Sequence, residues 1–290
     1  MYYYYFFSQT QPLIRIPSMV ISIARQAALC AALGLAGLAT TASAATLKIG
    51  TEGGYPPWSM VDASGKVTGF DADVGHALCK KLDMKCRFVV QAFDSLIPAL
   101  QAERFDLVIS GMSVTAERAK VIAFSIPYAT EDSAFVLPKD DALLKAADPK
   151  ALMAGLAGKT VGVQSGTTQG AFLQKYAPDL KLKTYETQDQ MQMDLSAGRL
   201  DATFSEVTPQ SQFLDTTGKG KFVMADAVVK SSADPDILGL GIGAGINQKN
   251  TELKAKVDKA LCELIADGTI KSSSTKWFGV DLSNYAACKK

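Results

Sequence analysis

Short apolar runs alternate with helically spaced segments along the first part of this 290-residue chain. Runs rich in β-branched and aromatic residues predict strands, and apolar residues recurring at helical spacing predict helices. Glycines and prolines preclude regular structure in residues 53–57, and a second turn follows at 62–65. The expected order is strand 47–50, helix 72–82, strand 85–90, helix 95–102 and strand 107–110.

A second unit of the same kind begins at Lys159. Alternating strands and helices indicate a mainly parallel sheet covered by helices on both faces. The chain is therefore expected to form two small α/β lobes. The elements expected in the second lobe are strand 160–164, helix 169–176, strand 181–185, helix 189–197 and strand 201–204.

Two extended apolar segments, residues 133–137 and 238–246, are expected to cross between these lobes. An amphipathic helix over 251–267 follows the second crossing, so the chain has to return to a lobe after it. Two crossings predict a hinge. Because open α/β sheets bind ligands at the carboxyl ends of their strands, we expect a binding cleft between the lobes.

Residues 1–44 have the features of a secretory signal peptide. They contain two arginines and no acidic residue, and residues 27–39 are almost entirely alanine, leucine and glycine. Small residues place the expected cleavage after Ala44. Two interpretations of the start stay open: translation from Met19, or a long charged leader. Cys30 lacks the preceding residues typical of a lipoprotein signal, so export without a lipid anchor is expected.

The expected mature chain has 246 residues and a formal charge of −1, with no basic run that would bind nucleic acid. No later segment is long and apolar enough to cross a bilayer. Four cysteines remain, and an oxidising compartment makes two disulfides the expected state. We predict the pairs Cys79–Cys86 and Cys262–Cys288. Zinc binding is the alternative, but the chain has one histidine and no Cys-x-x-Cys pair.

Residues 108–118 have the outline of a carboxylate receptor, because an apolar strand ends in small residues and is followed by a helix start that carries Arg118. A guanidinium offers a planar fork of donors that matches a carboxylate. Ser110, Gly111 and Ser113 have little side-chain bulk, so backbone groups there can approach a ligand. The alternative is an ordinary turn with a solvated arginine.

With these residues established, the chain from 47 to about 282 resembles the periplasmic solute-binding proteins of polar amino acid ABC importers, family 3. The likeness is to the lysine/arginine/ornithine-, histidine- and opine-binding branch. The motifs that carry it are residues 49–58, 69–73, 93–98, 112–118, 161–168, 196–202, 267–270 and 276–279.

The resemblance implies a type II periplasmic binding protein fold, with two α/β lobes joined by a two-segment hinge. The implied division is signal peptide 1–44, first lobe 45–132, second lobe 133–237, and a return to the first lobe with C-terminal helices over 238–290.

The resemblance also implies roles for residues in the cleft. Arg118 would bind the ligand α-carboxylate, assisted by backbone N–H groups at Ser113 and Thr168. Glu206 would take the α-ammonium, Tyr55 and Phe93 would sandwich the ligand side chain, and Glu52 would face its distal cation. The remaining implied site residues are Ser110, Gly111, Gln164 and Thr167.

One arginine and two acids give this site a charge of −1, which a ligand of net charge +1 neutralises. The expected function is capture of arginine, lysine, ornithine or histidine in the periplasm and delivery to a membrane permease. The protein is expected to be a monomer without a cofactor or metal, and not an enzyme.

Three alternatives remain. Gly111 stands where relatives often have serine, and the extra room favours bulkier opines such as octopine or nopaline. Exported cyclohexadienyl dehydratases resemble the same two-lobed fold, but they carry an acidic residue in the run that matches 164–169. A sensor ectodomain is the third, although the chain shows no signalling segment.

Overall fold

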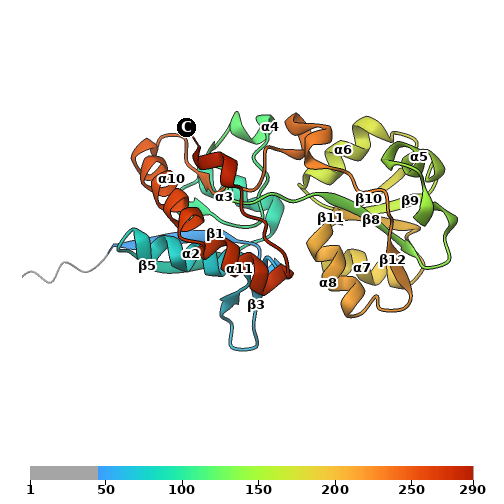
Figure 1. The fold of residues 1–290 in the computed structure, drawn as a ribbon, viewed down its shortest axis with the longest axis horizontal. Helices are drawn as coiled ribbons and strands as arrows, with labels where there is room; N and C mark the ends of the chain where they lie inside the picture. The colour runs from blue at the N-terminus through green and yellow to red at the C-terminus, as the bar shows by residue number, and fades with distance from the viewer. Residues whose placement is uncertain (1–44, 290) are drawn as a thin grey trace, which may run out of the picture. The chain divides into compact units, whose positions relative to one another are not determined.

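The computed structural model describes residues 45–289, so the predictions for the signal peptide, its cleavage and Cys30 lie outside the described residues. Two five-stranded sheets organise the described chain (Figure 1). We call the segments around them the first and second lobe. No helix within residues 45–289 is long and apolar enough to span a membrane.

The first sheet has the strand order β5-β1-β6-β13-β7. Strand β1 is parallel to β5 and β6, whereas β13 is antiparallel to both β6 and β7. The sheet is therefore mixed, and the predicted parallel arrangement holds for three of its strands. Its strands are β1 (Thr46–Thr51), β5 (Lys85–Val90), β6 (Leu107–Val108), β7 (Ala123–Phe124) and β13 (Gly245–Ile246).

The second sheet has the order β10-β9-β11-β8-β12. Strand β9 is parallel to β10 and β11, and β8 runs antiparallel to β11 and β12. The carboxyl ends of β9 and β11 and the loop after β10 consequently lie at one edge of the sheet. Its strands are β8 (Ser133–Pro138), β9 (Thr160–Gln164), β10 (Lys181–Tyr185), β11 (Ala202–Glu206) and β12 (Phe222–Met224).

Helices of the first lobe pack around a core that contains the buried rings of Trp58 and Phe70. Helix α2 begins after Gly69, whose φ of 111° favours glycine and whose added Cβ would collide with the Trp58 carbonyl oxygen. The first-lobe helices are α2 (Phe70–Lys81), η1 (Phe93–Ser95), α3 (Leu96–Gln101), α4 (Ala116–Ala119), α10 (Thr251–Ala266), α11 (Thr269–Phe278) and η4 (Tyr285–Cys288).

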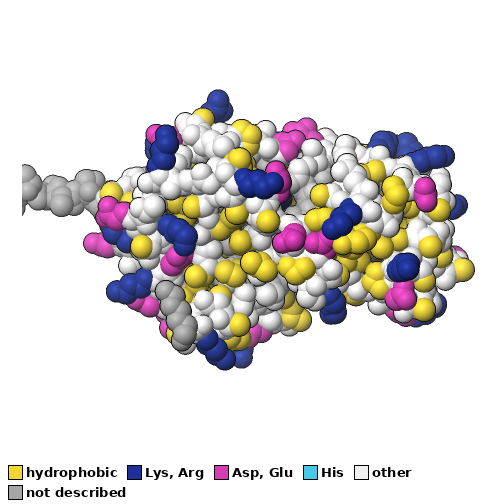
Figure 2. Space-filling model, turned by 90° about the horizontal axis from the view of Figure 1, so that it is seen from above, with side chains coloured by type: hydrophobic (Ala, Val, Ile, Leu, Met, Phe, Trp, Pro, Cys, Tyr) yellow, Lys and Arg dark blue, Asp and Glu magenta, His cyan; other side chains and the backbone are white. Residues whose placement is uncertain are grey.

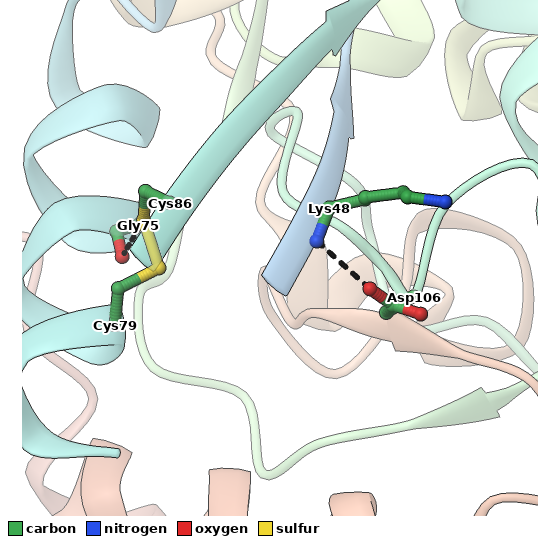
Figure 3. The surroundings of a disulfide bond; sticks show 5 residues. All are labelled: Lys48, Gly75, Cys79, Cys86 and Asp106. Carbon is green, nitrogen blue, oxygen red and sulfur yellow. Dashed lines mark hydrogen bonds between the residues drawn. A yellow bond between two sulfur atoms is a disulfide. The ribbon is translucent and has the colours of Figure 1, made fainter. Parts of the chain in front are cut away.

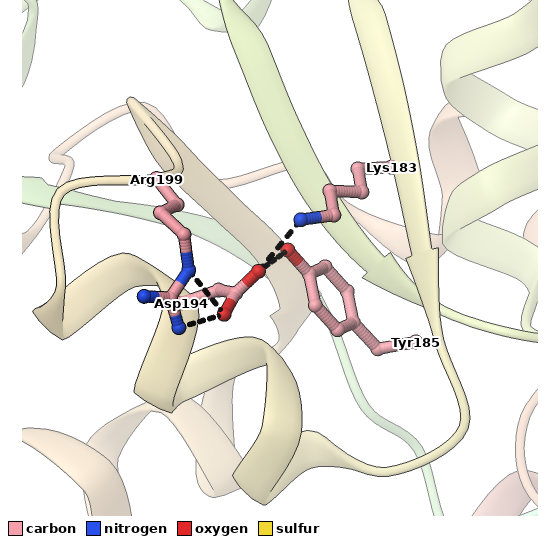
Figure 4. Close-up of polar contacts among 4 residues, drawn as sticks. All are labelled: Lys183, Tyr185, Asp194 and Arg199. Atoms are coloured by element: carbon pink, nitrogen blue, oxygen red, sulfur yellow. Dashed lines mark hydrogen bonds and ion pairs between the residues drawn. The ribbon is translucent and has the colours of Figure 1, made fainter.

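The second lobe has its own core, in which the rings of Phe135 and Phe204 stack with centroids 4.3 Å apart. At its outer side, Asp194 of α7 accepts hydrogen bonds from Lys183, Tyr185 and Arg199 (Figure 4). These donors hold the pKa of the Asp194 carboxyl well below its usual range. The second-lobe helices are η2 (Ala142–Lys145), α5 (Pro149–Gly155), α6 (Thr168–Tyr176), α7 (Gln188–Ser196), α8 (Val207–Asp215), η3 (Ser231–Ala233) and α9 (Pro235–Leu238).

Several elements differ from the sequence prediction. Residues 53–57 contain a short strand, β2 (Gly54–Tyr55), which forms a three-stranded sheet with β3 (Ser59–Val61) and β4 (Val67–Thr68). The segment 238–246 is not extended throughout, because Leu238 ends α9 and the backbone turns at Gly239 and Gly241 before β13. Helices α5, α8 and α9 were not predicted, and α11 was implied only as one of the C-terminal helices of the family resemblance.

The four cysteines of the described chain pair as the sequence predicts. Cys79 of α2 joins Cys86 of β5, with Cα atoms 5.7 Å apart (Figure 3). Cys262 of α10 joins Cys288, with Cα atoms 5.6 Å apart. Both pairs connect a helix of the first lobe to a neighbouring segment. In the face shown in Figure 2, basic and acidic side chains are interspersed, in keeping with the near-neutral sequence.

Candidate functional site

A small pocket lies between the two lobes. Ten of the eleven predicted ligand-binding residues line it, six from the first lobe and four from the second. The strand ends and loops that carry these residues meet there because each sheet directs its parallel strands toward the cleft. The lining residues are Glu52, Tyr55, Phe93, Gly111, Ser113, Arg118, Gln164, Thr167, Thr168 and Glu206.

Ser110 is the predicted residue that does not line the pocket. Its side chain is buried, and its Oγ accepts a hydrogen bond of 2.9 Å from the backbone N–H of Glu52. Ser110 therefore supports the turn that presents Glu52 instead of facing the pocket itself.

Arg118 is held in the pocket wall by defined partners and is not a solvated arginine at an ordinary turn. The Thr115 side chain caps α4 by accepting from the backbone N–H of Arg118 at 3.2 Å. The guanidinium donates to the carbonyl oxygens of Ser113 at 2.9 Å and Gly166 at 3.0 Å. It also lies 5.4 Å from the centre of the Phe93 ring. Burial lowers the pKa of Arg118 to about 10, so it stays cationic at neutral pH.

Glu52 is buried at the pocket, with 6% of its surface exposed. Its Oε1 accepts a hydrogen bond of 2.6 Å from the Gln164 amide of the second lobe. Burial raises the pKa of Glu52 to about 7, the hydrogen bond from Gln164 opposes this rise, and the nearby charge of Glu206 adds to it. The acid is thus poised between its neutral and ionised forms near neutral pH.

Glu206, the last residue of β11, is the second acid of the pocket. The Tyr55 hydroxyl donates to its carboxylate, and the Ser205 hydroxyl lies within 3.4 Å of the same oxygen. Burial and the charge of Glu206 raise the pKa of Tyr55 well above its usual value. Tyr55 therefore remains a hydrogen-bond donor that links the two lobes.

The charge of −1 counted from the sequence applies only when Glu52 is ionised. Below pH 7 the Glu52 carboxyl is mostly protonated, and Arg118 and Glu206 then balance each other. A cationic ligand beside Glu52 favours the ionised form, because an opposite charge lowers the pKa of a carboxyl. The pocket consequently gains its negative charge as such a ligand enters.

Gly111 has a backbone reason for lacking a side chain. Its φ of +54° lies in the left-handed region, which strains other residues. A Cβ added there would lie 3.4 Å from the Trp58 ring, in ordinary contact. The glycine therefore reflects the turn at the end of β6 as well as the space in the pocket.

Several further contacts join the lobes around the pocket. The Trp58 indole donates to Thr208 at 2.8 Å, and Ser165 donates to Asp94 at 3.1 Å. Gly166 approaches Asp94 so closely that an added Cβ would lie 2.9 Å from the Asp94 Cβ. The lobes are thus closed on each other at this edge.

Sequence reasoning missed polar residues behind the pocket wall. Gln188, with 1% of its surface exposed, donates to the Gln164 side chain at 3.2 Å and to Ser205 at 2.9 Å. Glu131 accepts from Thr208 at 3.1 Å, and burial together with the charge of Glu206 raises its pKa to about 8. The only sequence signal for Gln188 and Ser205 is their position at the carboxyl ends of strands next to β9.

Comparison with known proteins identifies the family of this chain. Residues 47–280 match the bacterial extracellular solute-binding proteins, family 3. The lysine/arginine/ornithine-binding periplasmic protein of Escherichia coli (strain K12) is 37% identical over 84% of this chain and 94% of its own length. ABC transporter arginine-binding protein 1 of the same organism is 35% identical over 84% of this chain and 96% of its own length.

Among solved structures, a Salmonella typhimurium periplasmic binding protein, described for its high arginine specificity, superimposes with a TM-score of 0.73. It is 33% identical, and the match covers 81% of this chain and all of that one. Fold, ordered motifs and relatives agree: the chain has the type II periplasmic binding protein fold and belongs to the bacterial extracellular solute-binding proteins, family 3.

Proposed function

We propose that this protein captures amino acids with a cationic side chain, foremost arginine, in the cleft between its lobes and delivers them to the permease of an ABC importer. The observation that carries the proposal is the lining of the pocket, in which one arginine and two buried acids come together between the lobes. An amino acid zwitterion with one distal cation pairs with all three of these charges.

Arg118 is the proposed partner of the ligand α-carboxylate. Its two bound carbonyl oxygens fix the guanidinium plane, and a planar fork held in place recognises a carboxylate through two parallel hydrogen bonds. Backbone N–H groups at Ser113 and Thr168 would add donors, since Thr168 opens helix α6 and its N–H has no partner within the helix. Carboxylates are also favoured at such helix starts.

Glu206 is the proposed acceptor for the α-ammonium, and Glu52 for the distal cation. Both acids are buried, at 8% and 6% exposure, so a ligand cation beside either one compensates a charge that is poorly solvated. Tyr55 and Phe93 border the space between them, and aromatic faces attract cations. These positions support an arginine-like ligand that lies across the pocket.

The export route and the partner follow from the same proposal. The family is described as extracellular and the lysine/arginine/ornithine-binding relative as periplasmic, which supports removal of residues 1–44 and a periplasmic location. Binding without catalysis is part of the proposal, because the run 164–169 lacks the acidic residue that the exported dehydratases carry there. We expect a monomer that meets its permease only transiently.

A ligand screen on stripped protein tests the proposal. The protein is unfolded to remove co-purified ligand, refolded, and heated with arginine, lysine, ornithine, histidine, glutamine, glutamate or octopine. A ligand that binds only the native state raises the unfolding free energy, by about 2.7 kcal/mol at one hundred times its Kd. Arginine should raise Tm most, and the Arg118→Ala variant should not respond. A rise with glutamate and none with any cation would refute the cationic assignment, and a larger rise with octopine would assign the opine class.

A further inference from the structure

We propose that Gln188 is a positioning residue that sets the preference of the pocket for a cationic side chain, although it touches no ligand itself. The proposal rests on the function proposed above and names the residue that orients Gln164 against Glu52. Gln188 opens helix α7 and lies behind the pocket wall, outside the lining. Its amide joins the two acidic ends of the site.

Both amide hydrogens of the Gln188 side chain are used in hydrogen bonds. Its Nε2 donates to Oε1 of Gln164 at 3.2 Å and to Oγ of Ser205 at 2.9 Å. Within residues 45–289 its Oε1 has no hydrogen-bond partner. A turned amide would point this oxygen at the Gln164 oxygen, placing two acceptors together, so the two donated bonds fix the orientation.

The Gln164 amide is fixed in turn. Its Oε1 accepts from Gln188, so its Nε2 has to face the other way, where it donates to Glu52 at 2.6 Å and to the Glu186 carbonyl oxygen at 3.1 Å. All of these amide hydrogens are therefore used. A turned Gln164 would present an oxygen to the Glu52 carboxylate, which disfavours the ionised acid that a ligand cation needs.

At the other end of the site, Gln188 supplies a donor to Ser205. The Ser205 hydroxyl accepts that bond, so its single hydrogen remains available for the oxygens of Tyr55 at 3.2 Å and Glu206 at 3.4 Å. Tyr55 meanwhile donates to Glu206. One buried amide thus fixes the hydrogen-bond direction at both acids.

The strand order explains how one residue reaches both ends. Strand β9 ends at Gln164 and lies between β10 and β11. Ser205 lies on β11, and Gln188 follows β10. The side chain of Gln188 therefore crosses the carboxyl end of β9. The sequence alone does not distinguish Gln188 from Gln190 and Gln192 of the same helix.

Gln188→Met tests the proposal, because methionine has a similar length and donates no hydrogen bond. Gln190→Met is the matched control, since Gln190 is an exposed residue of the same helix. The titration of the Glu52 carboxyl is followed by NMR in ligand-free protein, and the ratio of arginine to glutamine affinity is measured by calorimetry. Other ionisable groups that face Glu52 are Tyr55, Asp71, Asp94, Asp189 and Glu206. None of these is changed by either variant.

We expect Gln188→Met to move the Glu52 midpoint upward by about one pH unit, and to reduce the arginine-to-glutamine ratio about tenfold at pH 7, the scale of one charge-assisted hydrogen bond. Gln190→Met should leave both unchanged. In a Gln164→Met background, adding Gln188→Met should change neither quantity further, because the amide that it orients is gone.

An unchanged Glu52 midpoint in Gln188→Met would overturn the proposal, and so would an equal loss of affinity for both ligands. If the parent protein binds neither arginine nor glutamine, the proposed function fails, but the Glu52 midpoint still decides the role of Gln188. If Gln188→Met does not fold, Gln188→Asn gives the same comparison, because its shorter amide cannot reach both Gln164 and Ser205.

Discussion

Arginine binding below pH 7 should release a proton from Glu52. The Glu52 carboxyl has a pKa raised to about 7 by burial, and the arriving guanidinium stabilises its ionised form. At pH 6 the carboxyl is about 0.9 protonated before binding, so close to one proton should leave for each arginine bound. Above pH 8 the release should fall below about 0.1, because the acid is already ionised.

The same pKa predicts how the stability of the ligand-free protein changes with pH. The folded-state pKa of about 7 exceeds the ordinary value of 4.5, so the folded state binds more protons between these limits. The contribution to stability is full below pH 4.5 and is lost as pH rises to 7. The difference is about 2.5 units, or about 3 kcal/mol. Glu52→Gln should remove this dependence.

Calorimetry in two buffers with different ionisation enthalpies measures the proton release directly. Glutamine is the matched ligand, because it shares the α-carboxylate and α-ammonium but has no distal cation. Glu52→Gln should abolish the release with arginine and weaken arginine by about 2 to 4 kcal/mol more than glutamine. Release that persists in Glu52→Gln, or that is equal for both ligands, would refute the assignment and point to Glu131, whose pKa is raised to about 8.

Three further outcomes are expected. Arg118→Ala should weaken every amino acid ligand by about 3 to 5 kcal/mol in calorimetry. Lys120→Ala, which removes an exposed cation two residues along the chain, should not. Equal effects of the two variants would exclude a direct carboxylate contact. Arginine should reduce the radius of gyration of stripped protein in solution scattering, because the lobes close on the ligand; an unchanged radius at saturation would contradict hinge closure. Cys262→Ser with Cys288→Ser should lower the unfolding free energy by about 3.5 kcal/mol, and Cys79→Ser with Cys86→Ser by about 2.5 kcal/mol. The loss grows with the logarithm of the loop that each pair closes, and the sequence separations are 26 and 7 residues. Free thiols at these positions in the exported protein would exclude the bonds.

Strands β5, β9 and β10 were predicted to the residue. Helix α8 was not predicted, although its proline does not oppose a helix. Pro209 lies in the first helical turn, where the backbone nitrogen makes no helical hydrogen bond. Helix α11 contains a run of serines with weak helix propensity, and burial of Ile270 and Ser274 holds it in place. Both helices are stabilised by tertiary packing, which cannot be read from the local sequence pattern.

Ten of the eleven predicted site residues line the pocket, and their roles toward a ligand stay predictions. Residues that follow strand ends in ordered motifs, such as Glu52 and Arg118, could be placed from the sequence. The residues that orient them could not be placed, because the side chain of Gln188 has to be seen crossing the end of β9 before its role is visible. Ser110 was predicted to bind the ligand because it belongs to the same strand-end motif as Arg118. Its side chain instead accepts a hydrogen bond from the Glu52 backbone.

Strand β13 also decides the order in which the lobes can form as the chain emerges during synthesis. It pairs Gly245 with both Val108 and Phe124, so the first sheet has a gap between β6 and β7 until residue 246 is available. The five strands of the second sheet all lie between residues 133 and 224, and the core of that lobe is complete at Leu238. We expect the second lobe to fold first, while the first lobe waits with two unpaired strand edges that would need protection from aggregation.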